Sequence, residues 1–388
     1  MHGIHFLNKN SRLHMAASYT SHLFKELFTR IAQNASKVDQ EGCFPRDEFE
    51  WLAKGGLLKM MLPGENLDFN QSTTKELLQL LKNVGQASLP VGRVYEGHIN
   101  ALYLIHLFGS VEQQKMWYAD VADNKLFGVW NTQDQHGIKM HDMGSGKYQL
   151  EGFKTFCSGA SNVQRPLITG ELISENKKGW QMCIIPTECV KSITEDRSFW
   201  QPLGMRASAS YRMDFTGVEL DEEDLLGTPD SYYQQPYFGG GAIRFAAVQL
   251  GGAETMLAET HRFIRGMNRT QDPFQQARLA EMAYLVESGN LWLNQAGLKT
   301  DEWLKTPAQT EKILAYANMV RSAIEDICLR TMQLSERSVG SRGLMRPNAM
   351  ERVHRDLTTY LKQPAPDASL MSIGNYVYNQ DSTDGLWN

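Results

Sequence analysis

Two titratable side chains lie close together in the segment VYEGHIN, where Glu96 precedes His98 by two residues. Carboxylates and imidazoles are the groups that most often transfer protons in enzymes, so both are candidate catalytic residues. If the segment is a helix, residues two apart point in different directions, whereas Asn100 shares the face of Glu96. The structural alternative is an ion pair between Glu96 and Arg93, three residues earlier.

The sequence does not indicate other common kinds of reactive site. The five cysteines have no CxxC spacing and the ten histidines no HExxH pattern, so we expect neither disulfides nor a metal site. The net charge of −5 and the lack of a basic run argue against nucleic-acid binding. No stretch is apolar enough for a signal peptide or a membrane span, which predicts a cytoplasmic protein.

Three zones of the 388-residue chain differ in hydrophobic periodicity, and this length suits two or three packed subdomains. Residues 1–125 are rich in helix formers and are predicted to form a helical domain. Residues 126–232 contain short alternating runs, which predict a β domain. Residues 233–388 are predicted to form a four-helix bundle, because apolar residues recur every three or four positions, as in Ile313, Ala317, Val320, Ile324 and Ile327. The predicted fold class is α+β, mostly α.

Four motifs, in this order along the chain, resemble the acyl-CoA dehydrogenase family. LFGVWNTQDQHG (126–137) and LEGFKTFCSGASN (150–162) are similar to the two strands of that family that contact its flavin. LGMRASASYRMDFTGVELDEEDLLG (203–227) resembles the end of its middle domain, and GLMRPNAMERVHRDL (343–357) resembles its Arg-Asp helix. The resemblance implies the family's fold: an N-terminal helical domain, a middle β-barrel and a C-terminal four-helix bundle.

The same resemblance implies a flavin cofactor, FAD with FMN as the alternative. A flavin that accepts hydride needs hydrogen-bond donors along its ring to stabilise the charge that reduction adds. In the family, donors and flanking aromatic residues occupy fixed places in the two flavin-contacting strands. The residues that correspond to these places or lie beside them are Trp130, Asn131, Thr132, Phe156 and Ser158.

The resemblance also implies a homodimer or homotetramer, because the family builds each cofactor site from two subunits. Arg269 corresponds to a family Arg that holds the cofactor's pyrophosphate from a neighbouring subunit. Gly340 and Gly343, in the segment SVGSRG, are expected to let the backbone approach the dinucleotide across the same interface.

For the substrate, the resemblance implies an acyl thioester, carried by CoA or by a carrier protein. Arg244 corresponds to a family Arg near the thioester, and Tyr95 and Glu96 correspond to the pocket floor. The family's catalytic base is a carboxylate, desolvated enough to act near neutral pH, but Pro364 and Ile243 occupy its two usual positions. Two carboxylates remain as candidates for the base: Asp367, three residues beyond the first of these positions, and Glu96.

These residues lead to a principal hypothesis and two alternatives. The principal hypothesis is FAD-dependent α,β-dehydrogenation of an acyl thioester, with electrons passed to an acceptor flavoprotein. The first alternative, favoured by His98 together with Asn131 and Ser158, is a flavin monooxygenase of the same fold that takes reduced flavin from a partner reductase and uses dioxygen. The second is a flavin- or acyl-binding protein without turnover, which the missing base favours.

Overall fold

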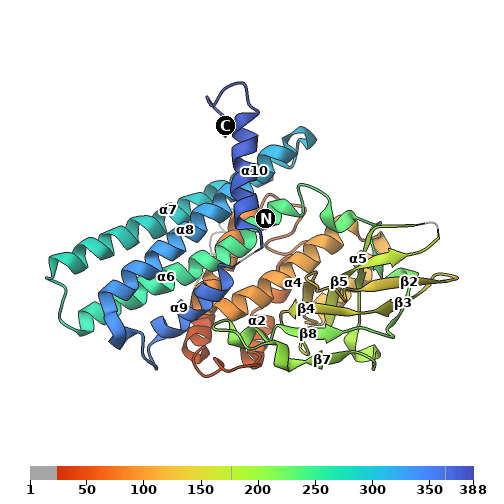
Figure 1. Cartoon of the computed structure of the whole chain (residues 1–388), viewed down its shortest axis with the longest axis horizontal. Coiled ribbons are helices and arrows are strands. Elements are labelled where there is room, and N and C mark those ends of the chain that lie inside the picture. The colour runs from red at the N-terminus through yellow and green to blue at the C-terminus, as the bar shows by residue number, and fades with distance from the viewer. Residues whose placement is uncertain (1–23, 176, 363) are drawn as a thin grey trace, which may run out of the picture.

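The computed structural model of the chain describes residues 24–175, 177–362 and 364–388. The predicted order of a helical part, a β part and a second helical part is confirmed (Figure 1). The first 23 residues of the predicted N-terminal domain lie outside the described residues. No helix within the described part of the chain combines the length and apolar character that a membrane span requires.

The N-terminal part is built around one long apolar helix, α4. This helix is buried along most of its length, because its sequence is apolar on nearly every side. Ser110 separates α4 from α5 and caps α5, since its hydroxyl accepts a hydrogen bond from the Gln113 N–H at 3.2 Å. The helices are α2 (Arg46–Lys54), α3 (Thr74–Ala87), α4 (Leu89–Phe108) and α5 (Val111–Ala122).

Two sheets make up the β part of the described chain. The larger follows the order β10-β6-β5-β2-β3-β9, with β1 added in parallel to β5, and the smaller follows the order β4-β8-β7. Buried and half-buried residues alternate along β8, as the sequence pattern predicts. The strands are β1 (Phe127–Trp130), β2 (Lys139–Gly144), β3 (Lys147–Glu151), β4 (Phe153–Cys157), β5 (Arg165–Ile173), β6 (Trp180–Ile184), β7 (Thr194–Asp196), β8 (Tyr211–Asp214), β9 (Glu219–Asp221) and β10 (Leu225–Leu226).

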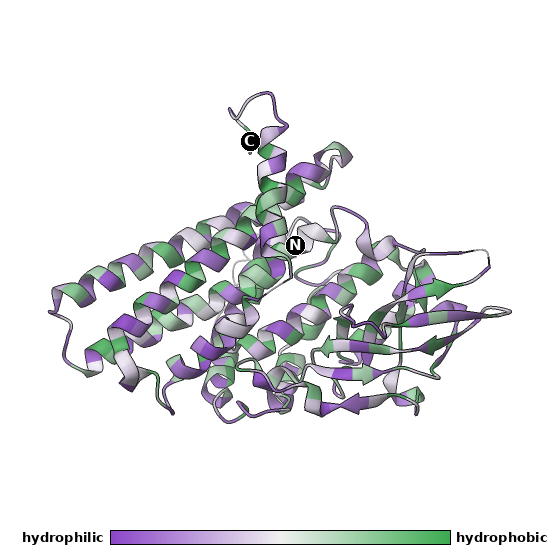
Figure 2. Cartoon of the chain, viewed as in Figure 1, coloured by the Kyte–Doolittle hydropathy of each residue, from purple (hydrophilic) through white to green (hydrophobic). Residues whose placement is uncertain are grey.

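The C-terminal part is a bundle of long helices that lie side by side (Figure 1). Hydrophobic and hydrophilic residues alternate along each of them, as expected for helices with one buried face (Figure 2). The apolar series that starts at Ile313 is buried in this bundle. The helices are α6 (Ala242–Gly266), α7 (Pro273–Trp303), α8 (Thr310–Gly343), α9 (Ala349–Tyr360) and α10 (Pro366–Tyr378).

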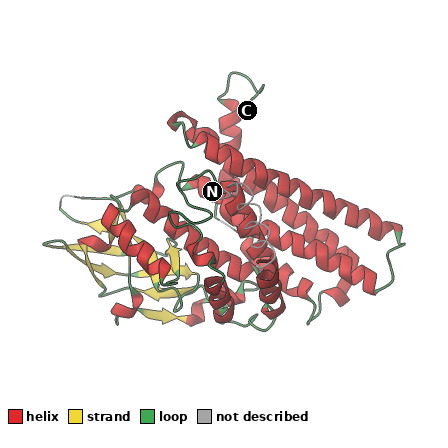
Figure 3. Cartoon of the chain, turned by 180° about the vertical axis from the view of Figure 1, so that it is seen from behind, coloured by secondary structure: helices red, strands yellow, loops and turns green. Residues whose placement is uncertain are grey.

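Helices α3 and α6 cross at very short range and join the N-terminal part to the bundle. A methyl group added at Gly85 would lie 2.3 Å from the carbonyl oxygen of Val248, so only glycine allows this approach. Beside the crossing, Lys82 Nζ forms an ion pair with Glu254 Oε1 at 2.7 Å. The view from behind shows the result, with the N-terminal helices between the β part and the bundle (Figure 3).

Candidate functional site

A cavity of about 540 Å³ opens between the β part and the end of α9. Its volume falls in the range of roughly 300–1,000 Å³ that is usual for small-molecule sites. Residues of the loop before β8 and the last residues of α9 complete its walls. The structure brings together here all the side chains that the sequence places beside a flavin ring: Trp130, Asn131, Thr132, Phe156 and Ser158.

The aromatic wall of this large cavity centres on Phe156, which projects from a bulge in β4. The pairing of β4 with β8 shifts register between Lys154 and Cys157, and Phe156 has φ 54°. A positive φ is uncommon for an aromatic residue and turns its ring out of the sheet. The rings of Phe199 and Trp200 meet it edge-on, with centroids 5.1 and 6.2 Å away. Apolar walls of this kind suit a flat ring system.

Three serine hydroxyls form a chain in the same cavity. Ser158 Oγ lies 3.0 Å from Ser210 Oγ, which lies 2.7 Å from Ser208 Oγ. The indole N–H of Trp130 donates to the Ser158 carbonyl at 3.0 Å and fixes both residues in the wall. Because hydroxyls rotate, this chain can redirect a donor toward a bound ring. Ser208 and Ser210 were not sequence candidates, although the motif LGMRASAS contains them.

Lys154 places a positive charge directly behind Asn131. Its side chain is fully buried, and Nζ donates to the Asn131 carbonyl at 2.9 Å, to Gln133 Oε1 at 2.6 Å and to Thr169 Oγ1 at 3.2 Å. Burial lowers its pKa to about 8, so the amine is mostly protonated at pH 7. Among the described residues, no carboxylate pairs with it. Such a charge stabilises negative charge in the adjoining cavity.

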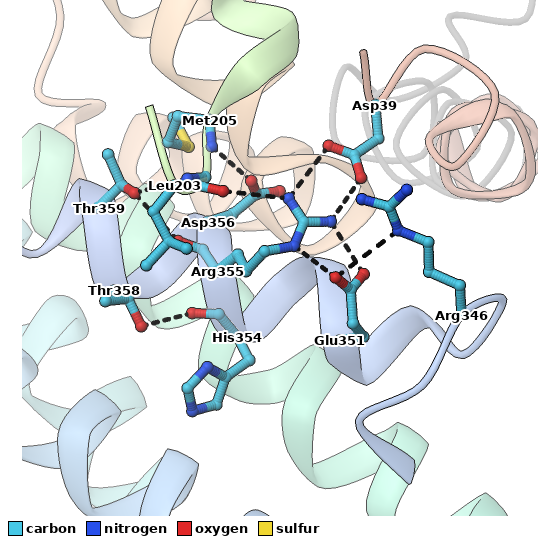
Figure 4. Close-up of polar contacts among 11 residues, drawn as sticks. Asp39, Leu203, Met205, Arg346, Glu351, His354, Arg355, Asp356, Thr358 and Thr359 are labelled. Atoms are coloured by element: carbon cyan, nitrogen blue, oxygen red, sulfur yellow. Dashed lines mark hydrogen bonds and ion pairs between the residues drawn. The ribbon is translucent and has the colours of Figure 1, made fainter. Parts of the chain in front are cut away.

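Helix α9 holds the Leu203–Met205 segment of the cavity wall (Figure 4). The Met205 N–H donates to Asp356 Oδ1 at 2.5 Å, and the Gly204 N–H donates to Thr359 Oγ1 at 2.9 Å. Two adjacent backbone amides are thereby fixed by one turn of helix. The position of this wall therefore depends on Asp356, which lies outside the cavity lining, as well as on Thr359, which is part of it.

Arg355 extends this network to the N-terminal part of the chain (Figure 4). Its Nη2 lies 2.5 Å from Asp39 Oδ2, and its Nε lies 2.6 Å from Glu351 Oε1. The hydrogen bonds to Glu351 and Asp39 raise the pKa of the guanidinium. Asp356, the next residue, is buried, and burial raises its pKa to about 7. A strongly held cation and a carboxylate that resists ionisation thus lie side by side.

Glu96 is held by an ion pair and a hydrogen bond from other residues of α4. Arg93 Nη1 lies 2.6 Å from Glu96 Oε2, which is the ion pair that the sequence offers as the structural alternative. The Asn100 amide donates to Glu96 Oε1 at 2.5 Å, and Arg244 Nε donates to Asn100 Oδ1 at 2.6 Å. Both carboxylate oxygens of Glu96 accept from cationic or amide donors, which disfavours its use as a base.

His98 and Tyr95 are packing residues of α4, and neither lines the large cavity. The Phe127 N–H donates to His98 Nδ1 at 3.1 Å, so Nε2 carries the ring proton and donates to the Leu58 carbonyl at 2.9 Å. Complete burial lowers the pKa of His98 to about 4, which keeps the ring neutral. The Tyr95 hydroxyl donates to the Leu57 carbonyl at 2.7 Å, and burial raises its pKa. The structure does not bring these two residues to the candidate site.

The other predicted site residues are spread over the bundle. Arg269 and Gly340 line a separate cavity of about 320 Å³, where Arg269 Nη2 lies 2.6 Å from Asp272 Oδ2. Gly340 interrupts α8 with φ 58° and ψ −164°, whereas Gly343 is buried at the end of that helix. Asp367 is exposed in the first turn of α10 and lines neither of these cavities.

The two positions that the resemblance assigns to the family's base lie at cavities but hold apolar residues. Pro364 lines the large cavity, and Ile243 lines a small cavity of about 100 Å³ together with Arg244. Of the described residues around the large cavity, Arg93 and Lys362 are charged and none is a carboxylate. The sequence does not reveal the cavity positions of these two cations, because they lie far from the flavin motifs along the chain.

The helical and β parts, with a cavity between aromatic rings and hydroxyls, define a flavoenzyme of the acyl-CoA dehydrogenase fold. Two family models match the chain: "Acyl-CoA dehydrogenase, N-terminal domain" over residues 24–125 and "Acyl-CoA dehydrogenase, C-terminal domain" over residues 243–362. The chain therefore belongs to the acyl-CoA dehydrogenase family, as its motifs predict, and is an acyl-CoA dehydrogenase-like flavin enzyme.

Similar proteins include both oxygenases and dehydrogenases. A dibenzothiophene monooxygenase from Rhodococcus erythropolis is 21% identical over 377 residues, which cover 89% of each chain. A probable FMNH2-dependent monooxygenase, SfnC from Pseudomonas putida, is 22% identical over 92% of this chain and 93% of its own. A probable acyl-CoA dehydrogenase, YngJ from Bacillus subtilis (strain 168), is 26% identical over 89% and 90%. Among solved structures, FMN-bound TdsC from Paenibacillus sp. A11-2 superposes with a TM-score of 0.84 at 18% identity, covering 95% of this chain and 100% of its own.

Proposed function

We propose that the chain is a flavin-dependent monooxygenase, which uses reduced flavin and dioxygen to place one oxygen atom on an organic substrate. Reduced flavin supplies two electrons, and the second oxygen atom leaves as water. The observation that carries this proposal is that no carboxylate lines the large cavity among the described residues. Removal of an α-proton from an acyl thioester requires such a base, whereas this oxygenation does not.

The carboxylates that the sequence offers for proton removal are unsuited to it in this structure. Glu96 is 3% exposed and has both oxygens bound by Arg93 and Asn100. Asp367 is exposed on α10, outside the cavity. The monooxygenase proposal no longer depends on His98, because the ring nitrogens of that residue are engaged in packing.

We propose FMN as the flavin, with FAD as the alternative. The aromatic and hydroxyl walls around Phe156 and Ser158 suit the ring, and Lys154 supplies positive charge behind them. The names of two similar proteins, FMN-bound TdsC and FMNH2-dependent SfnC, support FMN.

The proposal includes two kinds of partner. A flavin reductase would supply reduced FMN, because the electrons must come from outside the chain. A second copy of the chain, in a homodimer or homotetramer, is the assembly that the family resemblance implies, and light scattering of the purified protein measures it. An acyl-CoA dehydrogenase that passes electrons to an acceptor flavoprotein is the second candidate, favoured by the similarity to YngJ.

The test compares two reactions of the full-length protein. Under an atmosphere of isotopically labelled dioxygen, the protein receives FMN reduced by an added flavin reductase. Dibenzothiophene is supplied among other small aromatic and organosulfur compounds. Without oxygen, the flavin-loaded protein is titrated with acyl-CoA thioesters while the visible absorbance of the flavin is followed. We expect labelled oxygen in a product of the first reaction and no bleaching in the second.

Two other outcomes would contradict the proposal. Bleaching by a thioester would overturn the monooxygenase proposal and establish dehydrogenation. Bound flavin with neither result, across the full panel, would favour a binding protein without turnover. Ser158→Ala is expected to weaken flavin binding, whereas Ser174→Ala, which removes a hydroxyl bonded to Asp142 outside the cavity, is the matched control.

A further inference from the structure

Arg244 is a half-buried cation that forms no ion pair with any described carboxylate. It lies in the first turn of α6, where its Nε donates to the neutral Asn100 side chain at 2.6 Å. Its guanidinium carbon lies 5.0 Å from the centre of the Tyr103 ring. Burial lowers its pKa, and its terminal nitrogens make no hydrogen bond to any described residue. Charges that are withdrawn from water are normally paired in proteins, so the free terminal nitrogens of this guanidinium are candidate donors to an anion.

The carboxylates around Arg244 are already engaged. Glu96 reaches Asn100 from the other side, but it is paired with Arg93. Asp301 lines the same small cavity as Arg244, but its two oxygens accept from the Thr74 N–H at 3.1 Å and the Thr74 hydroxyl at 2.5 Å. These bonds commit Asp301 to the start of α3. Arg244 therefore has no carboxylate within ion-pair distance among the described residues, although Asp301 adds a negative charge to another part of the same lining.

The small cavity offers the donors that an oxyanion needs. Tyr103 and Tyr237 line it beside Arg244, and their hydroxyls make no hydrogen bond within the described part of the chain. Phe69 and Ile243 supply apolar walls. A volume of about 100 Å³ accommodates a few water molecules or one small acid group. A guanidinium binds such planar groups through two parallel hydrogen bonds.

We propose that this cavity binds an oxyanion, and that the substrate is an organic acid whose carboxylate or sulfinate group pairs with Arg244. The assignment to the substrate rests on the proposed function. A chain of polar contacts between the two cavities supports this assignment. Arg93 lines the large cavity and pairs with Glu96, Glu96 accepts from Asn100, and Asn100 accepts from Arg244. Tyr232 is half-buried and lies within electrostatic range of Arg93, Arg244 and Glu96, so these three charged groups are near one another.

The test is calorimetric titration of the full-length protein in the presence of oxidised FMN. Benzoate and benzenesulfinate are compared with benzamide, which has the shape of benzoate without its charge. We expect the acids to bind at least about tenfold more tightly than the amide, and Arg244→Gln to abolish this preference. Arg265→Gln, at an exposed position of the same helix, should keep it. Tyr103→Phe keeps the ring beside Arg244 and should weaken acid binding by a few-fold.

Equal binding of acid and amide by the unmodified protein would overturn the inference, and so would an unchanged preference in Arg244→Gln. If Arg244→Gln fails to fold in a thermal scan, the acid–amide comparison and Tyr103→Phe decide. Binding of inorganic sulfate alone, with no organic acid bound, would overturn the assignment to the substrate. No reduced flavin is present, so no oxygenation can occur in this titration, and acid preference and oxygenation can fail independently.

Discussion

The buried carboxyl of Asp356 leads to a prediction about pH and stability. The Asp356 carboxylate accepts a hydrogen bond from the Met205 N–H and so holds the wall of the large cavity. The residue is only 2% exposed, so a charge on it would be buried. Asp356→Asn removes the charge and keeps an oxygen that can accept the same hydrogen bond. The variant therefore separates the cost of burying charge from the benefit of holding the wall.

The magnitude follows from the pKa of Asp356, which rises from 3.8 to about 7. Burial is the largest cause and Asp39 adds to it, whereas the hydrogen bond from the Met205 N–H, and then Arg352 and Arg355, oppose it. A raised carboxyl pKa means that the folded state holds the proton more tightly than the unfolded chain. The free energy of unfolding is therefore highest below pH 4 for this group and falls as the pH rises to 7. The total loss is on the order of 4 kcal/mol, at about 1.4 kcal/mol per pH unit.

Urea denaturation of the protein and of Asp356→Asn at pH values from 5 to 8 checks this. The free energy of unfolding of the variant, relative to the unmodified protein, should rise by on the order of 3 kcal/mol across this range. Asp326→Asn, at an exposed position of α8, controls for the loss of one negative charge. Two stability curves that stay parallel from pH 5 to 8 would refute the reasoning, because Asp356 would then have the same pKa in both states.

Three further variants test the cavity and the packing around it. Gly204→Ala should weaken flavin binding on the order of tenfold, because its methyl group would lie 2.0 Å from the Arg355 carbonyl oxygen. Flavin fluorescence titration measures this. Gly266→Ala, whose methyl group would meet no atom within 4 Å, is the control. Lys154→Met should lower the preference for reduced over oxidised FMN on the order of tenfold, and an unchanged ratio of dissociation constants would contradict it. His98→Ala should lower the free energy of unfolding by about 2–4 kcal/mol in urea denaturation, and a variant of unaltered stability would show that the ring is not a packing residue.

The fold was predictable because its periodicities are long and regular. The series in α8 that begins at Ile313 and the alternation of Tyr211 and Met213 in β8 each bury one face, so pattern and structure coincide. The short crossing of α3 and α6 was not predictable, since Gly85 carries no pattern that names its partner. Such contacts depend on how distant elements pack, which local periodicity does not encode.

Within the site, the sequence predicted which residues of the flavin motifs lie at the cavity, but not the partners that surround each candidate residue. The motif around Phe156 predicted a residue beside the cavity, yet the bulge that turns its ring outward depends on pairing with β8. The chemical types of Glu96 and His98 made both candidate catalytic residues. In the structure, Glu96 forms an ion pair and His98 is a packing residue. Residue type indicates what a group can do, whereas its partners decide what it does.

The segment after α9 shows how a small change of sequence alters the chemistry available to the fold. Pro364 lines the cavity where the family has a carboxylate, and its carbonyl accepts from Arg321 Nη2 at 2.7 Å. Helix α10 starts two residues later, so Asp367 falls in an exposed first turn. The cavity keeps the cations Arg93 and Lys362 on its walls and a third behind Asn131, without a carboxylate among the described lining residues. Such a cavity stabilises negative charge, as a site that holds reduced flavin requires. It also lacks a carboxylate of the kind that would accept the proton in dehydrogenation.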